Sequence, residues 1–171
     1  MKECAVHNDK DGKSGPWHRA VLLMATGFGL GLSPVASGTA GTVPGLFIAW
    51  ALAYAAVGWQ IAAGAILAAA AIPVCDLAER HFGRKDDGRI VADEYLTFPL
   101  CVIGLPIVSE PWILAVAFVT NRAFDVIKPF PARRLQKLPG GLGIVADDVF
   151  SSLYALAANH LIFRLFHFFA S

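Results

Sequence analysis

The chain contains no Asp, Glu, Lys or Arg between Ala20 and Cys75, and this gap limits its possible folds more than any other feature. A helical crossing of a bilayer takes about 20 apolar residues, so this stretch is long enough for more than one crossing. The whole chain is 56% hydrophobic and only 16% charged, whereas soluble domains average about 25% charged. We therefore expect either a membrane protein or a helical bundle whose central helices are buried on all sides.

Breaks within the first apolar segment predict a helical hairpin. Residues 43–75 are too many for one comfortable crossing, and "VGWQ" at 57–60 offers a turn. We expect two short helices there, over about 43–57 and 60–80. Alanine dominates the apolar segments and clean alternation is absent, so strands are not indicated.

Two later apolar segments extend this pattern. Residues 95–120 are interrupted by "GLPIVSEP" at 104–111, whose prolines and Glu110 predict a second hairpin. Residues 148–168 predict one long final helix. The fold class is therefore expected to be all-α, a compact helical bundle that is multi-pass or membrane-embedded with helical hairpins.

The charged residues gather in two islands, 76–94 and 121–148. Because hairpins return the chain to the side it left, both islands and the N-terminus should share one face. Their many Lys and Arg residues make that face cytoplasmic by the positive-inside tendency. Residues 1–16 are polar and lack the apolar core of a signal peptide, so we expect a disordered cytoplasmic tail before one membrane domain at 17–171. The net charge of +1 predicts no nucleic-acid partner, and nothing indicates an obligate protein partner.

Four polar stretches punctuate the apolar chain. The first, "GLGLSPVASGTAGTVPG" at 29–45, is rich in Gly and Thr and carries no charge. If it forms a turn that opens a helix, its free backbone N–H groups and the hydroxyls of Thr39 and Thr42 could bind an anion. A helix contact made by small residues, or a plain loop, is the alternative. No Lys follows the glycines, so the Walker pattern does not fit.

The second and third stretches hold charged groups at the ends of apolar segments. "DDGRIVADEY" at 86–95 ends in Asp93 and Glu94, which could be solvated or could favour a helix start. In "NRAFDVIKPFPARR" at 121–134, helical spacing places Arg122, Asp125 and Lys128 on one face. An ordinary surface ion pair, worth at most about 1 kcal/mol, is the alternative there.

The fourth stretch is "GGLGIVADD" at 140–148, where Asp147 and Asp148 should lie in or just before the first turn of the last helix. Capping would need only one of them. Two adjacent carboxylates repel unless a cation lies between them or one of them points away, and Mg²⁺ prefers carboxylate and phosphate oxygens. Together the four stretches supply what a metal-dependent phosphoryl reaction at a lipid surface requires.

The four motifs, "GFGLGLSP…GTAGT", "IVADEY", "FDVIKPFP" and "GGLGIVADD", occur in an order and at spacings that resemble the phosphatidylglycerophosphatase A family. The resemblance extends from Trp17 to the C-terminal helix. It implies a Mg²⁺-dependent enzyme of the bacterial inner membrane, with its active site on the cytoplasmic face. The implied reaction, a step of phospholipid biosynthesis, hydrolyses phosphatidylglycerophosphate to phosphatidylglycerol and inorganic phosphate.

Motif by motif, the resemblance implies site residues. The expected metal ligands and general base come from Asp93, Glu94, Asp125, Asp147 and Asp148, with individual roles left open. Lys128 is expected to be catalytic and to bind phosphate together with Thr39, Gly41 and Thr42. Arg122 lies just before the third motif, and its charge makes it a further candidate for phosphate binding. Two positions depart from the family pattern: Thr97 stands where Gly is usual, and Ser37 where Pro is usual.

Two other hypotheses remain at this point. The chain could be a small membrane transporter or channel subunit whose carboxylates line an ion path, although such groups usually lie near mid-membrane. It could also be a soluble helical phosphatase. A covalent aspartyl-phosphate intermediate stays open as well.

Overall fold

The computed structural model describes residues 15–170, which are all-α with no strand among them. The α-helices are α1 (Pro16–Ala25), α2 (Ser37–Leu52), α3 (Val57–Phe82), α4 (Ala92–Thr97), α5 (Trp112–Ile127), α6 (Ala132–Leu135) and α7 (Gly140–Ala170). Two 3₁₀ helices, η1 (Leu30–Leu32) and η2 (Phe98–Val102), complete the fold. The all-α prediction is confirmed. Most of the predicted tail, residues 1–14, lies outside the described residues, and α1 begins at Pro16.

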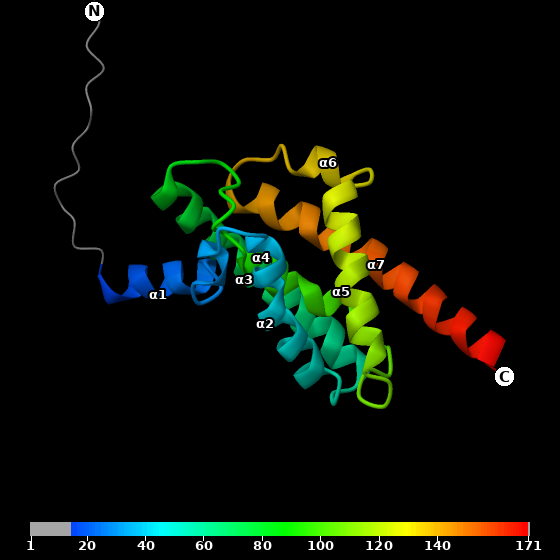
Figure 1. Ribbon diagram of the computed structural model, residues 1–171. Helices are drawn as coiled ribbons and strands as arrows, with labels where there is room; N and C mark the ends of the chain where they lie inside the picture. Colours follow the sequence, from blue (N-terminus) through cyan, green and yellow to red (C-terminus); the bar gives the residue numbers. More distant parts are fainter. Residues whose placement is uncertain (1–14, 171) are drawn as a thin grey trace, which may run out of the picture.

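Helix α7 packs against much of the bundle, whereas α1 packs against α3, and α2 packs mainly against α4 and η2. Helix α7 contacts α3, α5, α6, α4 and η2, and its C-terminal part projects beyond the other helices (Figure 1). The short α4–η2 segment lies in the middle of the molecule, against α2, α3 and α7. Phe98 and Cys101 of η2 are fully buried there. The second hairpin therefore differs from its prediction, because its first arm is a short buried segment and only α5 forms a long arm.

The first hairpin turns four residues earlier than predicted, since α2 ends at Leu52 and α3 begins at Val57. Gln60, which suggested a break, lies in the first turn of α3. Its side-chain amide donates to the Ala55 carbonyl at 2.9 Å, and its oxygen accepts from the Gly104 amide at 2.9 Å. The polar residue thus stabilises the two turns at this end of the bundle instead of interrupting a helix.

Helix α2 begins at Ser37, six residues before the predicted start, because its glycines serve helix packing. A Cβ on Gly41 would lie 2.4 Å from Cβ of Val91, and one on Gly45 would lie 2.7 Å from Cβ of Phe98. Small residues let two helices approach closely, which is the alternative that the sequence left open for this stretch. The expectation of a glycine-rich turn over Gly41 is therefore wrong.

Helix α7 begins at Gly140, eight residues before the predicted start. Gly140 has φ +64°, and a Cβ on Gly141 would meet the backbone oxygen of Ile72 at 2.1 Å. The "GGLG" sequence therefore opens the helix and brings it against α3. Asp147 and Asp148 consequently lie about two turns inside α7, where they cannot act as helix caps.

Buried polar groups connect α5 to α7 along the bundle. Ser152 donates to Asn121 at 3.0 Å, and Thr120 donates to Asn159 at 2.7 Å. Asn159 in turn donates to the carbonyl of Cys101 at 2.9 Å. Such paired polar groups hold helices together in an apolar environment.

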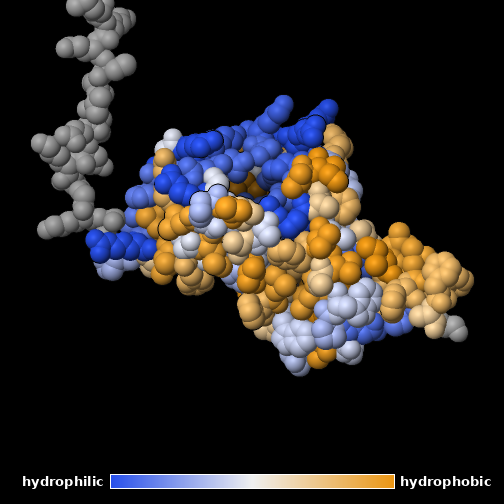
Figure 2. All heavy atoms as spheres, in the orientation of Figure 1, coloured by the Kyte–Doolittle hydropathy of each residue, from blue (hydrophilic) through white to orange (hydrophobic). Residues whose placement is uncertain are grey.

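Two helices, α3 and α7, are long and apolar enough to cross a membrane. Only 22% of the most apolar window of α3 is buried inside the protein, unlike the central helix of a soluble bundle. Large apolar side chains are exposed along both helices, including Trp59, Ile66, Phe166 and Phe169. Hydrophilic side chains gather at the end of the molecule that carries α6 and the loop between α3 and α4 (Figure 2). This distribution favours membrane association over the soluble alternative.

Candidate active site

A cleft of about 320 Å³ lies at the hydrophilic end of the molecule. The N-terminus of α2, the start of α4, the end of α5 and the early turns of α7 all contribute to it. Among the described residues, its lining holds six carboxylates and two cations: Asp86, Asp93, Glu94, Asp125, Asp147, Asp148, Arg122 and Lys128. The two charged islands of the sequence therefore meet in one cavity, as the hairpin argument predicts.

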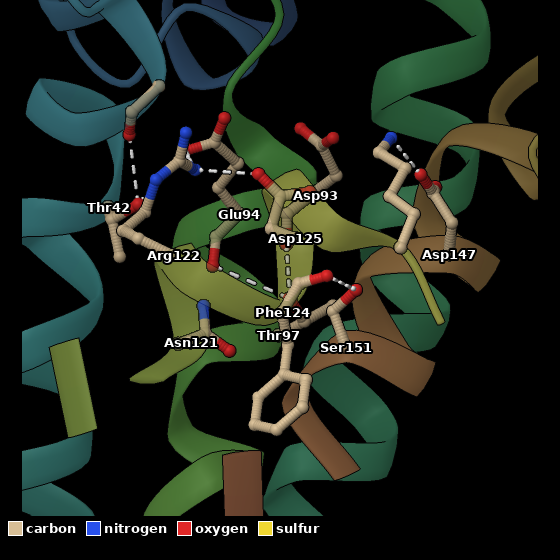
Figure 3. Close-up of polar contacts among 12 residues, drawn as sticks. Thr42, Asp93, Glu94, Thr97, Asn121, Arg122, Phe124, Asp125, Asp147 and Ser151 are labelled. Atoms are coloured by element: carbon tan, nitrogen blue, oxygen red, sulfur yellow. Dashed lines mark hydrogen bonds and ion pairs between the residues drawn. The ribbon is translucent and has the colours of Figure 1, made fainter. Parts of the chain in front are cut away.

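Arg122 organises one wall of the cleft. Its Nη1 lies 2.8 Å from Glu94 Oε2 and 3.1 Å from Asp125 Oδ2 (Figure 3). The Thr42 hydroxyl donates to the same Glu94 oxygen at 2.9 Å. Burial raises the pKa of Glu94, and Arg122 and Thr42 oppose that rise. This wall is a partly buried ion-pair network, which fixes the two carboxylates in place.

Lys128 and Asp147 form the opposite wall, with Nζ 2.5 Å from Oδ2 (Figure 3 draws this contact). Lys128 ends α5 in the left-handed conformation at φ +47°, and its amide donates to the Phe124 carbonyl. Burial would lower the pKa of Lys128, but Asp147 and the neighbouring carboxylates raise it. The amine is therefore protonated and supplies positive charge to the cleft.

Asp93 and Asp148 lie at the buried floor, 6% and 7% exposed. Asp93 Oδ1 has no hydrogen-bond partner among the described residues. Burial raises the pKa of Asp93 to about 8, the hydrogen bond with Asp148 opposes this, and the charges of Glu94 and Asp147 add to it. A buried carboxylate that lacks a counter-charge is costly unless a proton or a cation neutralises it.

The carboxylates of the cleft fit a divalent cation. Asp125, Asp147 and Asp148 each offer an oxygen, and these oxygens lie within 4.8 Å of one another. Together with the unpartnered Asp93 oxygen, they form an oxygen-rich and negatively charged set. Mg²⁺ and Ca²⁺ prefer such ligands, whereas thiolates and imidazoles are absent from the described lining of the cleft.

The glycine-rich stretch contributes differently from its prediction. Thr39 is exposed and does not line the cleft, and Gly41 packs against Val91. Thr42 is buried and holds Glu94. Ser37 and Gly38 line the cleft instead, and no side chain caps the N-terminus of α2. The amides open to an anion are thus those of the first turn of α2.

Sequence reasoning missed Asp86 and Gly38. Asp86 lines the cleft in the left-handed conformation at φ +52° and accepts from Gln136 at 2.7 Å. A Cβ on Gly38 would lie 2.3 Å from Glu94 Oε1 and 2.8 Å from Arg122 Nη2. A "DDG" pattern is typical of a turn, but the direction of the Asp86 side chain depends on its contact with Gln136 at the end of α6, which the sequence does not show.

The two departures from the family pattern fall beside the cleft. Thr97 is fully buried, and its hydroxyl donates to the Asp93 carbonyl at 2.7 Å. It therefore braces the helix turn that carries Asp93. Ser37 begins α2 and adds a hydroxyl to the lining of the cleft.

Residues 23–163 match the family model for phosphatidylglycerophosphatase A. The chain belongs to the phosphatidylglycerophosphatase A family. It is 31% identical to phosphatidylglycerophosphatase A of Escherichia coli over 152 residues, covering 87% of this chain and 84% of that protein. It is 36% identical to the Haemophilus influenzae protein of the same name, covering 80% and 84%.

A third relative has a different name. The chain is 32% identical to a Bacteroides thetaiotaomicron protein provisionally named phosphatidylinositol-3-phosphatase, covering 78% of this chain and 87% of that protein. All three names describe phosphatases that act on a phosphate monoester. No solved structure matches the chain.

Proposed function

We propose that this protein is a Mg²⁺-dependent lipid phosphatase that hydrolyses phosphatidylglycerophosphate to phosphatidylglycerol and inorganic phosphate. The observation that supports this best is the charge of the cleft. Six carboxylates and two cations converge there among the described residues, in a chain that belongs to this family. In bacteria, the reaction would complete the synthesis of phosphatidylglycerol.

The cations and amides of the cleft would bind the phosphate monoester. Arg122 and Lys128 come from α5, the first-turn amides come from α2, and these groups face the same space. Donors fixed in advance stabilise the charge that spreads over the phosphoryl oxygens in the transition state. Their pairing with carboxylates keeps both side chains in place before the substrate arrives.

Asp125, Asp147 and Asp148 would hold the Mg²⁺ ion. When bound, the ion would supply positive charge to the phosphoryl group and help to activate water. We assign Asp93 as the general base, because its Oδ1 is unpartnered and its pKa of about 8 suits proton transfer near neutral pH. Glu94 would position Arg122.

We place the cleft at the cytoplasmic face of the bacterial inner membrane, in a multi-pass chain. The basic residues of both islands lie at this end, which agrees with the positive-inside tendency. The transporter alternative would need ionisable groups near mid-membrane, whereas the carboxylates of the cleft cluster at one end of the bundle. An active site at the headgroup level suits a substrate whose phosphate lies at the interface.

The test is phosphate release from phosphatidylglycerophosphate by detergent-purified protein, with Mg²⁺ and with a chelator. We expect release with Mg²⁺ and none with the chelator. Release that is unaffected by chelation would remove the metal from the proposal. Folded protein that releases no phosphate under either condition would overturn the proposal for this substrate.

Phosphatidylinositol 3-phosphate, assayed in parallel, addresses the name of the third relative. We expect it to be hydrolysed much more slowly, because its bulky ring must enter a cleft of about 320 Å³. If that lipid were hydrolysed faster, the protein would still be assigned as a lipid phosphatase, but with phosphatidylinositol 3-phosphate as its substrate.

A further inference from the structure

A second cavity, of about 520 Å³, adjoins the catalytic cleft and shares Lys128 with it. Its lining consists of four cations and two large apolar residues: Ile127, Lys128, Phe130, Arg133, Arg134 and Lys137. We call it the α6 groove, because Arg133 and Arg134 lie on α6. The catalytic reaction, as proposed above, does not use it.

The charge of the α6 groove is not balanced within the groove. No carboxylate occurs among its described lining residues. Arg133 donates to the Ile127 carbonyl at 3.3 Å, and Arg134 lies over the Phe130 ring at 4.9 Å. These contacts orient the two guanidinium groups without neutralising them. An exposed guanidinium in a fixed position suits a phosphate oxygen.

The groove also presents apolar surface beside its cations. Ile127 and Phe130 are 60% and 67% exposed, and apolar and hydrophilic side chains adjoin near α6 in Figure 2. The Tyr154 hydroxyl donates to the Phe130 carbonyl at 2.7 Å, which fastens the groove to α7. Cations next to exposed apolar groups match a lipid headgroup, where a phosphate joins a glycerol and acyl chains.

We propose that the α6 groove binds the phosphodiester of the same lipid whose terminal phosphate occupies the catalytic cleft. This inference rests on the proposed function. A glycerol links the two phosphates of that lipid, and the two cavities share a wall at Lys128. One molecule can therefore span both cavities, so that the groove selects lipid substrates over small phosphate monoesters.

Arg133→Gln combined with Arg134→Gln tests the proposal. We expect KM for phosphatidylglycerophosphate in neutral detergent to rise about tenfold, because exposed charge-assisted hydrogen bonds are lost. The kcat should stay within about twofold, since the catalytic cleft is unchanged. Hydrolysis of glycerol 3-phosphate, which lacks the phosphodiester, should not change in kcat/KM.

The matched control removes the same charge elsewhere on this face, with Arg80→Gln combined with Arg84→Gln. Both residues line a different cavity, and we expect little change in KM. An equal rise in KM for both double variants would show a general effect of surface charge and would overturn the proposal. An unchanged KM in the Arg133/Arg134 variant would overturn it as well. A rise that appears only when phosphatidylglycerol is added would assign the groove to a bystander lipid.

A binding measurement separates this proposal from the proposed function. Phosphatidylglycerol carries the phosphodiester but no monoester, so it should raise the Tm of the wild type and not that of the Arg133/Arg134 variant. Phosphatidylcholine carries the same phosphodiester together with a choline cation, which the four cations of the groove would repel, so it should affect both proteins weakly and equally. An inactive wild type would overturn the proposed function. Equal stabilisation of both proteins by phosphatidylglycerol would instead overturn the proposal that the α6 groove binds the phosphodiester.

Discussion

The catalytic cleft and a neighbouring cavity contain the same kinds of side chain but differ in how their charges are arranged. The neighbouring cavity, of about 560 Å³, lies between the end of α3 and the start of α7. Among the described residues that line it, two carboxylates face three cations, and Asp76 pairs with Arg80 at 2.8 Å. The smaller cleft, of about 320 Å³, has six carboxylates and two cations in its described lining.

This difference shows that size and residue type alone do not identify the site. In the neighbouring cavity, Asp76 pairs with Arg80 and cations outnumber carboxylates. Glu79 Oε2 is buried without a hydrogen-bond partner among the described residues, but the charges that line this cavity with it are mainly opposite to its own. In the cleft, Asp93 and Asp148 are buried with like charges around them. Folding tolerates such an arrangement when a ligand supplies the missing positive charge. The four predictions below test this contrast.

The largest effect should come from neutralising one carboxylate in each cavity. We expect Asp148→Asn to lower kcat by about 10²- to 10³-fold, because the cleft loses charge that binds and aligns the reacting groups. The variant should still insert into the membrane. Asp76→Asn in the neighbouring cavity should keep activity within about twofold. Phosphate release in detergent with Mg²⁺ measures both.

The Tm of the two variants, measured without metal, tests the same contrast independently of activity. Asp148→Asn should leave the Tm of the metal-free protein unchanged or raise it, because one repelling carboxylate is gone. Full activity of Asp148→Asn would remove Asp148 from the site. An equal loss in Asp76→Asn would remove the contrast between the two cavities.

Two glycines provide the second test. Gly38 lines the cleft, whereas a Cβ built on Gly58 would point into open space. A Cβ on Gly38 would press on Glu94 and Arg122, whose side-chain ends can shift. Gly38→Ala should therefore fold normally and lose about 10²-fold in kcat/KM, since small misplacements of catalytic groups are costly. Gly58→Ala has no atom within 4 Å of the new Cβ and should behave as wild type.

The kinetics and the Tm of both variants decide the outcome. If Gly38→Ala keeps wild-type activity, then the position of the Glu94–Arg122 pair does not limit the reaction. If it loses Tm as well as activity, then Gly38 serves packing, like Gly41.

The pattern of apolar and charged segments was sufficient to predict which motifs meet in the site. Hairpins return the chain to one side, so "IVADEY", "FDVIKPFP" and "GGLGIVADD" had to meet at one end. Asp93, Glu94, Asp125, Lys128, Asp147 and Asp148 all line the cleft. Their individual roles stay predictions.

The starts of α2 and α7 could not be predicted from the sequence. Glycine in a helix is less favourable than alanine by about 1 kcal/mol, so glycine-rich stretches suggest turns. Gly41 and Gly141 lie in helices since each admits a neighbouring segment that no side chain would allow. Such contacts are tertiary and leave no local pattern. The placement of Thr39 outside the cleft follows from the same early start of α2.

The third prediction concerns pH and metal binding. The pKa of Asp93 is raised to about 8, chiefly by burial, so the metal-free protein holds a proton there at neutral pH. Mg²⁺ held by Asp125, Asp147 and Asp148 would add positive charge beside Asp93, so metal binding would disfavour that proton and leave Asp93 free to act as the base. We expect Mg²⁺ affinity to rise up to about tenfold per pH unit between pH 6 and 8, and to level off above. Calorimetric titration at several pH values measures this.

The sign of the accompanying stability change follows from the same shift. The folded protein holds the Asp93 proton more tightly than the unfolded chain does. Without metal, the free energy of unfolding should therefore fall as the pH rises from about 4 towards 8. A Mg²⁺ affinity that is constant between pH 6 and 8 would contradict the raised pKa.

The fourth prediction has the smallest expected effect. It distinguishes the role of the Lys128 amine from the role of the backbone conformation at this position. Lys128 ends α5 at φ +47°, a conformation that glycine adopts more readily than alanine. Lys128→Gly and Lys128→Ala should lose activity equally, because both remove the amine that pairs with Asp147. Lys128→Gly should be more stable than Lys128→Ala by about 1 kcal/mol. Chemical denaturation in detergent measures the difference.

Lys85 is the matched lysine of the neighbouring cavity, and its amine donates to the carbonyls of Lys137 and Leu138 at 3.3 and 3.1 Å. Lys85→Ala should keep activity, because this amine neutralises no carboxylate of the cleft. Activity in Lys128→Gly but not in Lys128→Ala would mean that the backbone at this position matters and the amine does not. Loss of activity in Lys85→Ala would instead show that both cavities work as one charged surface, because activity would then require a lysine in each of them.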